Sequence, residues 1–390
     1  MSSLQSVRSA ARVALLAAAL IFNVSRGSAQ TVVSAPLARW TVDSRPTFES
    51  TKELGGETPT LMTARGAMRL PDGTIVVADD GTKEVKWFAP EGNFIRSQGR
   101  DGEGPGEYKL LQLIGSCGTD SVFVFDGTNG RLTTLTSNGK LAGTRLVLVN
   151  EPDHKMPYTL KCGRTRHLVM FGWPNGAIPQ SDVPFRSEME LRIQAIEGST
   201  SRLIGRVQGP ERHRFGTSAG PRPLGKKTVL AVGADRIYVG TGDTPIIRVS
   251  SFTGAKLPDV ALPFVPEPIT PRDVQYYIQR LIDLNPGRSA ARLRQDYGAL
   301  TYPDQFPTHG ELIVDSEDNL WVEQYRRPGE DTSRWVVLNR AGQLIADVVL
   351  PSRFRAIEVG RHFVLGTSED RDEVLHVQLL TLNRSPARNR

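Results

Sequence analysis

Short apolar segments separated by polar turns recur along the chain. In the clearest copy, residues 70–98, the polar turn Pro71–Gly73 precedes the apolar run Ile75–Ala78, and two further strands follow that are joined by a turn containing Gly92. Runs of four to six apolar, β-branched or aromatic residues bounded by turn residues are typical of short β-strands. The pattern therefore predicts an all-β fold built from many short strands.

These copies repeat along most of the sequence. The first apolar residue after each polar turn marks them at Ile75, Val122, Leu168, Ile237, Leu320 and Phe363. The gaps of 47, 46, 69, 83 and 43 residues compare with the ~40–50 residues of a four-stranded propeller blade. The longer gaps contain extra segments at 172–188, 208–225 and 268–306. We therefore expect a six-bladed β-propeller over residues 30–383.

The ends of the repeat indicate how the ring closes. Hairpin glycines occur in five of the copies, at Gly92, Gly139, Gly198, Gly254 and Gly342, where tight turns favour a positive φ. The last copy lacks an outer strand and ends in the basic tail 384–390, while the apolar segment 38–42 precedes the first copy. We expect this N-terminal strand to complete the last blade, which removes an open sheet edge.

One part of the chain carries a family resemblance. Residues 77–88 (VADDGTKEVKWF), 91–95 (EGNFI) and 99–108 (GRDGEGPGEY) resemble an NHL repeat, and residues 310–321 do so more weakly. The chain is similar to exported bacterial six-bladed propellers of the NHL/TolB-like kind. That resemblance implies the fold. It implies no single activity, because the wider group includes binding proteins, lactonases and lyases.

The N-terminus has the features of a secretory signal peptide. Arg8 and Arg12 precede the apolar run 13–24, and Gly27–Ala29 is a small-residue cleavage site. The apolar run is shorter than the roughly 20 residues of a membrane-spanning helix, and no later segment is long and apolar enough to span. We expect cleavage after residue 29 and export to the periplasm or the medium.

Charge argues against nucleic acid as a partner. The whole chain has 48 basic and 42 acidic residues. Arg8, Arg12 and Arg26 leave with the signal peptide, so the mature chain has 45 basic residues and a net charge of about +3. No helix or stripe concentrates these basic residues in the way that a nucleic-acid site requires. As a separate expectation, the mature protein is a monomer.

The two cysteines occupy equivalent positions in consecutive repeats. Cys117 and Cys162 each stand at the end of an innermost strand, directly before a glycine. Neighbouring blades place such strand ends side by side, and an exported protein meets an oxidising environment. We therefore expect a Cys117–Cys162 disulfide. The alternative is a pair of buried free thiols.

The segment 268–306 departs from the strand pattern. Thr270 is a good N-cap, Pro271 suits the first helical position, and Asp273 is the acidic third residue. Apolar residues then follow at helical spacing until Asn285, and a second short helix is expected over 289–297. This helical insertion between blades 4 and 5 either packs on the rim or forms a lid over the central channel.

Three familiar patterns lack the context that their chemistry requires. Gly216–Gly220 matches the nucleophile elbow but has no following helix, so we expect a flexible loop. The glycine-rich Gly99–Gly106 is followed by a strand rather than by a phosphate-binding helix, which favours a crossover between blades. The six histidines show no metal-binding spacing, so we expect no bound metal and assign no catalytic residue.

Ligands of propellers usually meet the residues at which the innermost strands begin. Alignment of the repeats places these positions near Met62, Lys109, Tyr158, Lys226, Lys227, His309 and Arg355. Most of these side chains are cationic and none is a carboxylate, which suits an anionic ligand and repels a divalent cation. The alternative is that the lysines and arginines extend into solvent at the channel mouth.

Acidic residues follow the second strands of several repeats. They are Asp79, Asp80, Asp126, Asp243, Glu369 and Asp370. They are able to bind a cation, to neutralise the basic set, or to act only as turn formers, since Asp side chains bond to their own backbone.

Two functions fit these observations. The first is an exported, non-catalytic binding propeller without a cofactor, which recognises a protein, peptide, glycan or other anionic ligand at the channel face. The second is a lactonase- or lyase-like hydrolase with a metal such as Ca²⁺ in the channel. The basic set at the strand starts favours the first function.

Overall fold

The computed structural model describes residues 37–50, 61–118, 120–147, 157, 159–172, 183–215, 218–370 and 374–385. The expected signal peptide and Tyr158 lie outside these residues. Within them, no helix is long and apolar enough to cross a membrane.

Four sheets have four strands each, hydrogen-bonded in sequence order. The first contains β2 (Ala64–Arg69), β3 (Ile75–Asp79), β4 (Glu84–Phe88) and β5 (Phe94–Gln98). The second contains β6 (Leu111–Gly115), β7 (Val122–Asp126), β8 (Arg131–Leu135) and β9 (Leu141–Leu146). The third contains β10 (Thr159–Cys162), β11 (His167–Gly172), β12 (Glu188–Ala195) and β13 (Arg202–Gln208). The fourth contains β16 (Val229–Val232), β17 (Arg236–Gly240), β18 (Ile246–Ser251) and β19 (Lys256–Ala261).

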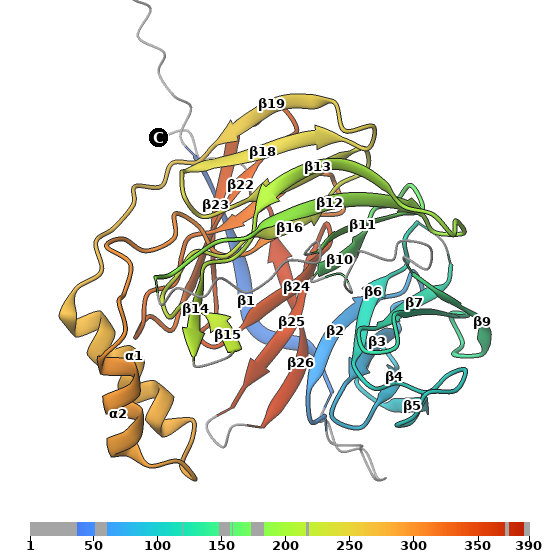
Figure 1. Ribbon diagram of the computed structural model, residues 1–390. Helices are drawn as coiled ribbons and strands as arrows, with labels where there is room; N and C mark the ends of the chain where they lie inside the picture. Colours follow the sequence, from blue (N-terminus) through green and yellow to red (C-terminus); the bar gives the residue numbers. More distant parts are fainter. Residues whose placement is uncertain are drawn as a thin grey trace, which may run out of the picture. The chain divides into compact units, whose positions relative to one another are not determined.

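The remaining long strands form one eight-stranded sheet in the order β20-β21-β22-β23-β1-β26-β25-β24. Its first half contains β20 (Leu312–Val314), β21 (Leu320–Glu323), β22 (Ser333–Leu338) and β23 (Leu344–Leu350). Its second half contains β24 (Arg355–Val359), β25 (Phe363–Glu369), β26 (Leu375–Asn383) and β1 (Ala38–Glu49). The sheets therefore make an all-β, propeller-like arrangement (Figure 1).

The N-terminal strand explains why these two halves are one sheet. As expected, β1 pairs antiparallel with β26, with Val42 opposite Leu382. It also pairs in parallel with β23, with Ala38 opposite Ala346. The expectation of six separate four-stranded sheets is therefore corrected, because β1 has 12 residues, more than one blade edge needs, and joins two of them.

Buried apolar side chains fill the spaces between consecutive sheets. Val76 and Val85 of the first sheet cluster with Val122 and Val124 of the second. Similar clusters follow at each later step. A further cluster packs Leu365 and Val377 against the side chains of the first sheet.

The innermost strands surround a common axis. β2, β6, β10, β16, β20 and β24 contact one another in that order, and β24 contacts β2. We call the end of the sheets at which these innermost strands begin, and at which the second strands end, the mouth face. The loops that join one sheet to the next also lie on this face, because each outermost strand ends there.

The strands predicted from the repeat are confirmed. All six marker residues, from Ile75 to Phe363, lie at or next to the first position of the second strand of a set. Four of the five hairpin glycines have a positive φ, between 78° and 99°. Gly198 does not, so the conformational reason given for it was wrong.

The helical insertion is present as predicted. α1 (Pro271–Asp283) is N-capped by Thr270, whose side chain and that of Asp273 form a capping box. α2 (Ala290–Gly298) is N-capped by Ser289. Both helices lie at one side of the sheets (Figure 1, orange).

The predicted disulfide is also present. Cys117 and Cys162 are bonded, with their Cα atoms 5.2 Å apart and a sequence separation of 45. The bond joins the second sheet to the third at the end opposite the mouth face.

Candidate functional site

The described parts of the extra segments lie on the mouth face. They are residues 183–188 of the first segment, 208–215 and 218–225 of the second, and 268–306 of the third. Phe185 of the first exchanges backbone hydrogen bonds with Arg212 of the second (3.0 and 2.9 Å), and the Arg222 Nε of the second donates to the Thr301 carbonyl of the third (3.1 Å). These contacts build a wall along the part of the mouth face formed by the third to fifth sets of strands.

The second segment contains a hairpin where a flexible loop was expected. β14 (Arg212–Phe215) pairs antiparallel with β15 (Ser218–Pro221). Ser218 is thus followed by a strand and not by the helix that a nucleophile elbow needs. The strands were missed because they are four residues long and rich in Gly, Pro and Arg, without apolar alternation.

The acids that follow the second strands hold the starts of the innermost strands. The carboxylate of Asp79, which is fully buried, accepts from the backbone N–H groups of Met62 and Thr63 and from Lys86 Nζ at 2.7 Å. Asp126 accepts from the backbone of Lys109 and Leu110 in the same way. These side chains are therefore turn formers whose lone pairs are already used.

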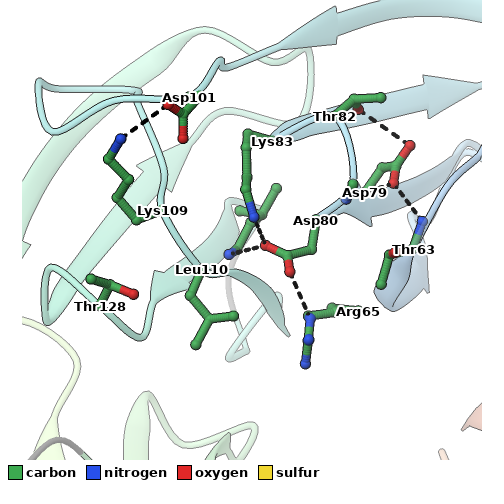
Figure 2. A network of polar contacts seen from close by, with 12 residues as sticks. Thr63, Arg65, Asp79, Asp80, Thr82, Lys83, Asp101, Lys109, Leu110 and Thr128 are labelled. Atoms are coloured by element: carbon green, nitrogen blue, oxygen red, sulfur yellow. Dashed lines mark hydrogen bonds and ion pairs between the residues drawn. The ribbon is translucent and has the colours of Figure 1, made fainter. Parts of the chain in front are cut away.

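Asp80 directly follows β3 of the first sheet and binds the start of the innermost strand of the second sheet (Figure 2). Its carboxylate accepts from Arg65 Nε at 2.9 Å, from Lys83 Nζ at 2.7 Å and from the backbone N–H of Leu111 at 2.8 Å. Burial opposes its ionisation, but the two cations and the backbone donor together keep its pKa below the usual value. Asp80 thereby links the first sheet to the second at the mouth face.

The predicted basic residues have different surroundings. Lys109 Nζ pairs with Asp101 at 3.0 Å (Figure 2), and Lys226 Nζ lies 3.7 Å from Glu211. Lys227 and Arg355 are exposed. The expectation that no carboxylate lies among them is corrected, since Asp101 and Glu211 come from the crossover loops, which the strand alignment does not cover.

His309 is built into the fold. Its side chain is buried, its Nδ1 lies 2.9 Å from the carbonyl oxygen of Gly310, and its Nε2 accepts from the backbone N–H of Gly242 at 3.2 Å. Burial lowers the pKa of His309, so the ring is neutral at pH 7. It adds no positive charge to the mouth face.

Lys161 is a basic residue that the strand alignment missed. Its neighbours on β10, Leu160 and Cys162, pack toward the second sheet, so Lys161 points the other way. Loss of hydration lowers the pKa of Lys161. The negative charge of Glu311 opposes this shift, and the positive charge of Arg355 adds to it. Lys161, Glu311 and Arg355 belong to three different sets of strands, and charges from these sets interact most closely near the axis that the innermost strands surround.

The exposure of Lys161 supports this position. Its side chain is exposed, yet it is surrounded closely enough by protein to lose hydration. Both properties hold for a side chain that lies in the space between the innermost strands. Lys161 stands three residues after the expected strand start at Tyr158 and therefore fell outside the aligned positions.

A second charged group lies on the innermost strands, where Glu358 occupies the same register position as Lys161. Glu358 of β24 accepts from the backbone N–H of Arg69 at 2.9 Å. Burial raises the pKa of Glu358 to about 7, and the charges of Arg69 and Arg164 only partly oppose that shift. Arg164 is itself held by the carbonyl of Asp315 at 3.1 Å.

Two further sequence patterns have structural roles. In the glycine-rich crossover, Glu107 accepts from the Gly104 N–H at 2.7 Å and pairs with Arg100. A Cβ at Gly102 would lie 2.2 Å from the Glu107 Oε2, so the Glu107 side chain would have to shift and give up its present hydrogen bonds. Among the described residues, no three His, Cys, Asp or Glu side chains are grouped so that they could hold a metal ion.

Comparison with known proteins supports the fold. No protein-family model matches the sequence, and no curated protein matches it. A member of the DUF4221 family from Bacteroides vulgatus is similar in structure, with a TM-score of 0.52 and 11% identity over 90% of this chain and 100% of that chain.

Two other solved structures have lower scores. A suspected exported protein from Bacteroides fragilis has a TM-score of 0.46 and 12% identity over 85% of this chain and 94% of its own. A gluconolactonase from Xanthomonas campestris has a TM-score of 0.44 and 13% identity over 90% and 99%. At these identities the comparisons show the propeller-like fold alone.

Proposed function

We propose that this chain is an exported, non-catalytic six-bladed propeller that binds an anionic ligand at its mouth face. The proposal rests on three charges from different sets of strands that interact across the ring, the cations Lys161 and Arg355 and the carboxylate Glu311. Within the described residues, the side chains of Lys161 and Arg355 make no hydrogen bond or ion pair with the protein, while their backbones pair within the sheets. Their charge is available to a ligand.

The wall adds positive charge to the same face. Between residues 208 and 227 one acidic residue, Glu211, stands against five basic ones: Arg212, Arg214, Arg222, Lys226 and Lys227. A face with charge of one sign raises the local concentration of oppositely charged ligands. The segment therefore favours the approach of an anion to the axis.

The alternative, a hydrolase with a channel metal, is less well supported. A divalent cation needs several oxygen ligands with free lone pairs. Asp79, Asp126 and Glu323 all accept hydrogen bonds from the starts of the innermost strands. Binding a cation would require these structural bonds to be broken.

The count of six blades rests on the ring of innermost strands. β20–β23 and β24–β26 with β1 each have four strands around the axis, and only the short pairing of β1 with β23 merges them. The NHL-like segment 77–108 contains β4 and β5 of the first of these blades. The signal-like N-terminus supports export.

Binding of labelled anions tests the proposed function. Fluorescent hexaglutamate and trigalacturonate are titrated with the full mature chain at low and physiological salt. We expect Lys161→Met and Arg355→Met each to weaken binding by about 10-fold or more, as for the loss of a charge-assisted contact. Higher salt should weaken the wild type more than either variant.

The control removes an equal charge elsewhere. Lys256 lies on the outermost strand β19 with a side chain that is 81% exposed, and Lys256→Met should leave binding unchanged. Absence of binding to either anion would contradict the proposal, as would equal weakening by Lys256→Met.

A further inference from the structure

A hollow of about 200 Å³ lies between the third and fourth sheets, at the end opposite the mouth face. Its lining comes from the start of β11, the end of β12, the start of β13 and the turn that follows β18 (Figure 1). The lining residues include His167, Ile193, Thr200, Arg202 and Phe252. Thr200 and Arg202 are exposed, so the hollow opens to solvent.

The corresponding place between the first and second sheets is filled by Trp87. This residue pairs with Arg96 of the outermost strand, and its indole Nε1 donates to the carbonyl of Ser137 in the hairpin turn of the next sheet at 2.8 Å. A Cβ at Gly139 of the same turn would lie 3.3 Å from the indole ring. The tryptophan therefore spans the space from its own sheet to the neighbouring turn.

The third sheet has an isoleucine where the first sheet has this tryptophan. Ile193 pairs with Arg202 as Trp87 pairs with Arg96. Arg202 donates to the carbonyls of Phe252 at 2.7 Å and Thr253 at 3.1 Å, in the hairpin turn of the fourth sheet. An isoleucine side chain extends less far from its strand than an indole ring. The hollow therefore follows from the size of residue 193.

The hollow combines a cation, two rings and free hydrogen-bonding groups. Among the described residues the guanidinium of Arg202 has no ion pair, and its bonds to two neutral carbonyls fix its orientation. The rings of His167 and Phe252 lie 5.5 Å apart between centroids and form one aromatic surface. The Nδ1 of His167 lies 2.7 Å from the carbonyl oxygen of Thr165. In the described part of the chain, the His167 Nε2 and the Thr200 hydroxyl have no hydrogen-bond partner.

These groups suit a single ring that carries a carboxylate. The volume is below the ~300–1,000 Å³ of pockets for drug-sized ligands and several times the ~30 Å³ that one water molecule occupies in the liquid. A guanidinium group binds carboxylates through charge-assisted hydrogen bonds, and rings pack against aromatic side chains.

We propose that this hollow binds a small organic acid with one ring, its carboxylate toward Arg202 and its ring against Phe252 and His167. The ring is either aromatic or that of a sugar acid, since both share this chemistry. The site lies at the other end of the sheets from the mouth face, so the inference is independent of the proposed function.

NMR titrations of the full mature chain test the inference. The probes are benzoate and glucuronate, with benzamide and glucose as their neutral counterparts. We expect at least one acid to bind about 10-fold or more tightly than its neutral counterpart. Arg202→Gln should remove this preference, because the amide still donates to a carbonyl but has no charge. Ile193→Trp should abolish binding, because the indole fills the space as Trp87 does in the first sheet.

Two matched variants serve as controls. Arg96→Gln removes the equivalent arginine of the first sheet, which donates to the carbonyl of Asn138, and should leave binding unchanged. Lys161→Met should also leave it unchanged, and loss of acid binding in that variant would place the acid at the mouth face instead.

Three other results would overturn the inference. They are equal binding of the acids and their neutral counterparts, no binding of either acid, and an acid preference that survives Arg202→Gln. Because Arg202→Gln keeps the size of the site nearly unchanged, it decides the matter even where Ile193→Trp fails to fold. None of these three results bears on anion binding at the mouth face.

Discussion

Glu358 is a carboxyl group whose ionisation the fold opposes. Burial raises its pKa from 4.5 to about 7, so between these pH values the native state holds a proton that the unfolded chain has lost. The contribution of Glu358 to stability is therefore fully present below pH 4.5 and is lost as the pH rises through 7. A charged carboxylate at this position at pH 8 destabilises the native state.

Glu358→Gln is expected to stabilise the protein at pH 8 and to have little effect at pH 4.5. The amide oxygen still accepts from the Arg69 N–H, and the variant has no charge to bury. The gain should be about 1–3 kcal/mol at pH 8, because one pKa unit corresponds to ~1.4 kcal/mol. Urea unfolding at both pH values measures it, and an equal effect of the variant at both would contradict the burial argument.

For single residues, the sequence predicted the place of a residue in the repeat better than it predicted which residue its side chain contacts. Cys117 and Cys162 were paired correctly because both stand at the same place in consecutive repeats. Lys109 was placed at a strand start, but its partner Asp101 belongs to a crossover loop with no repeat pattern. Lys161 was missed, because its approach to Glu311 and Arg355 depends on strands far apart in sequence.

Helices and strands were predicted most reliably where the signal lies within a few neighbouring residues of the sequence. The helix α1 was predicted to the residue at its start, because Thr270 and Asp273 form the cap within four residues of sequence. The strand β1 was predicted over 38–42 only. Its later part, to Glu49, alternates poorly and contains Pro46, and its pairing with β23 is visible only in three dimensions.

Trp40→Ala tests the role of β1 in closing the ring. Trp40 is 8% exposed, packs against Trp321 and carries the Arg384 guanidinium 4.6 Å from its ring centroid. Its loss should lower the free energy of unfolding by about 3–5 kcal/mol. Deleting residues 30–50 should prevent cooperative folding, because it also bares the edges of β23 and β26.

The neighbouring residue supplies the matched control. Arg39 is 74% exposed and its Nε lies 3.6 Å from Asp347, so Arg39→Ala should change stability by less than about 1 kcal/mol. Guanidinium denaturation compares the variants. A truncated chain that keeps the wild-type midpoint would show that β1 does not close the ring.

In the whole molecule, the apolar clusters determine whether the sheets unfold together or one after another. Each set of strands packs against both of its neighbours, and the last cluster returns to the first sheet. A linear array of repeats is able to unfold from its ends, whereas a closed ring has no terminal unit. The sequence predicted this closure from the unclaimed N-terminal strand, although it predicted separate sheets.

Two substitutions in different clusters test the closed ring. Val76 and Val337 are both fully buried, the first between the first and second sheets and the second in the cluster that includes Trp40. Val→Ala at each should cost about 1–3 kcal/mol and leave the denaturant slope unchanged, because the same surface is exposed in one transition. The double variant should lose the sum of the two, since the sites share no contact. A second, earlier transition in either variant would mean that part of the ring unfolds alone, and that the β1 closure does not couple the sheets into one cooperative unit.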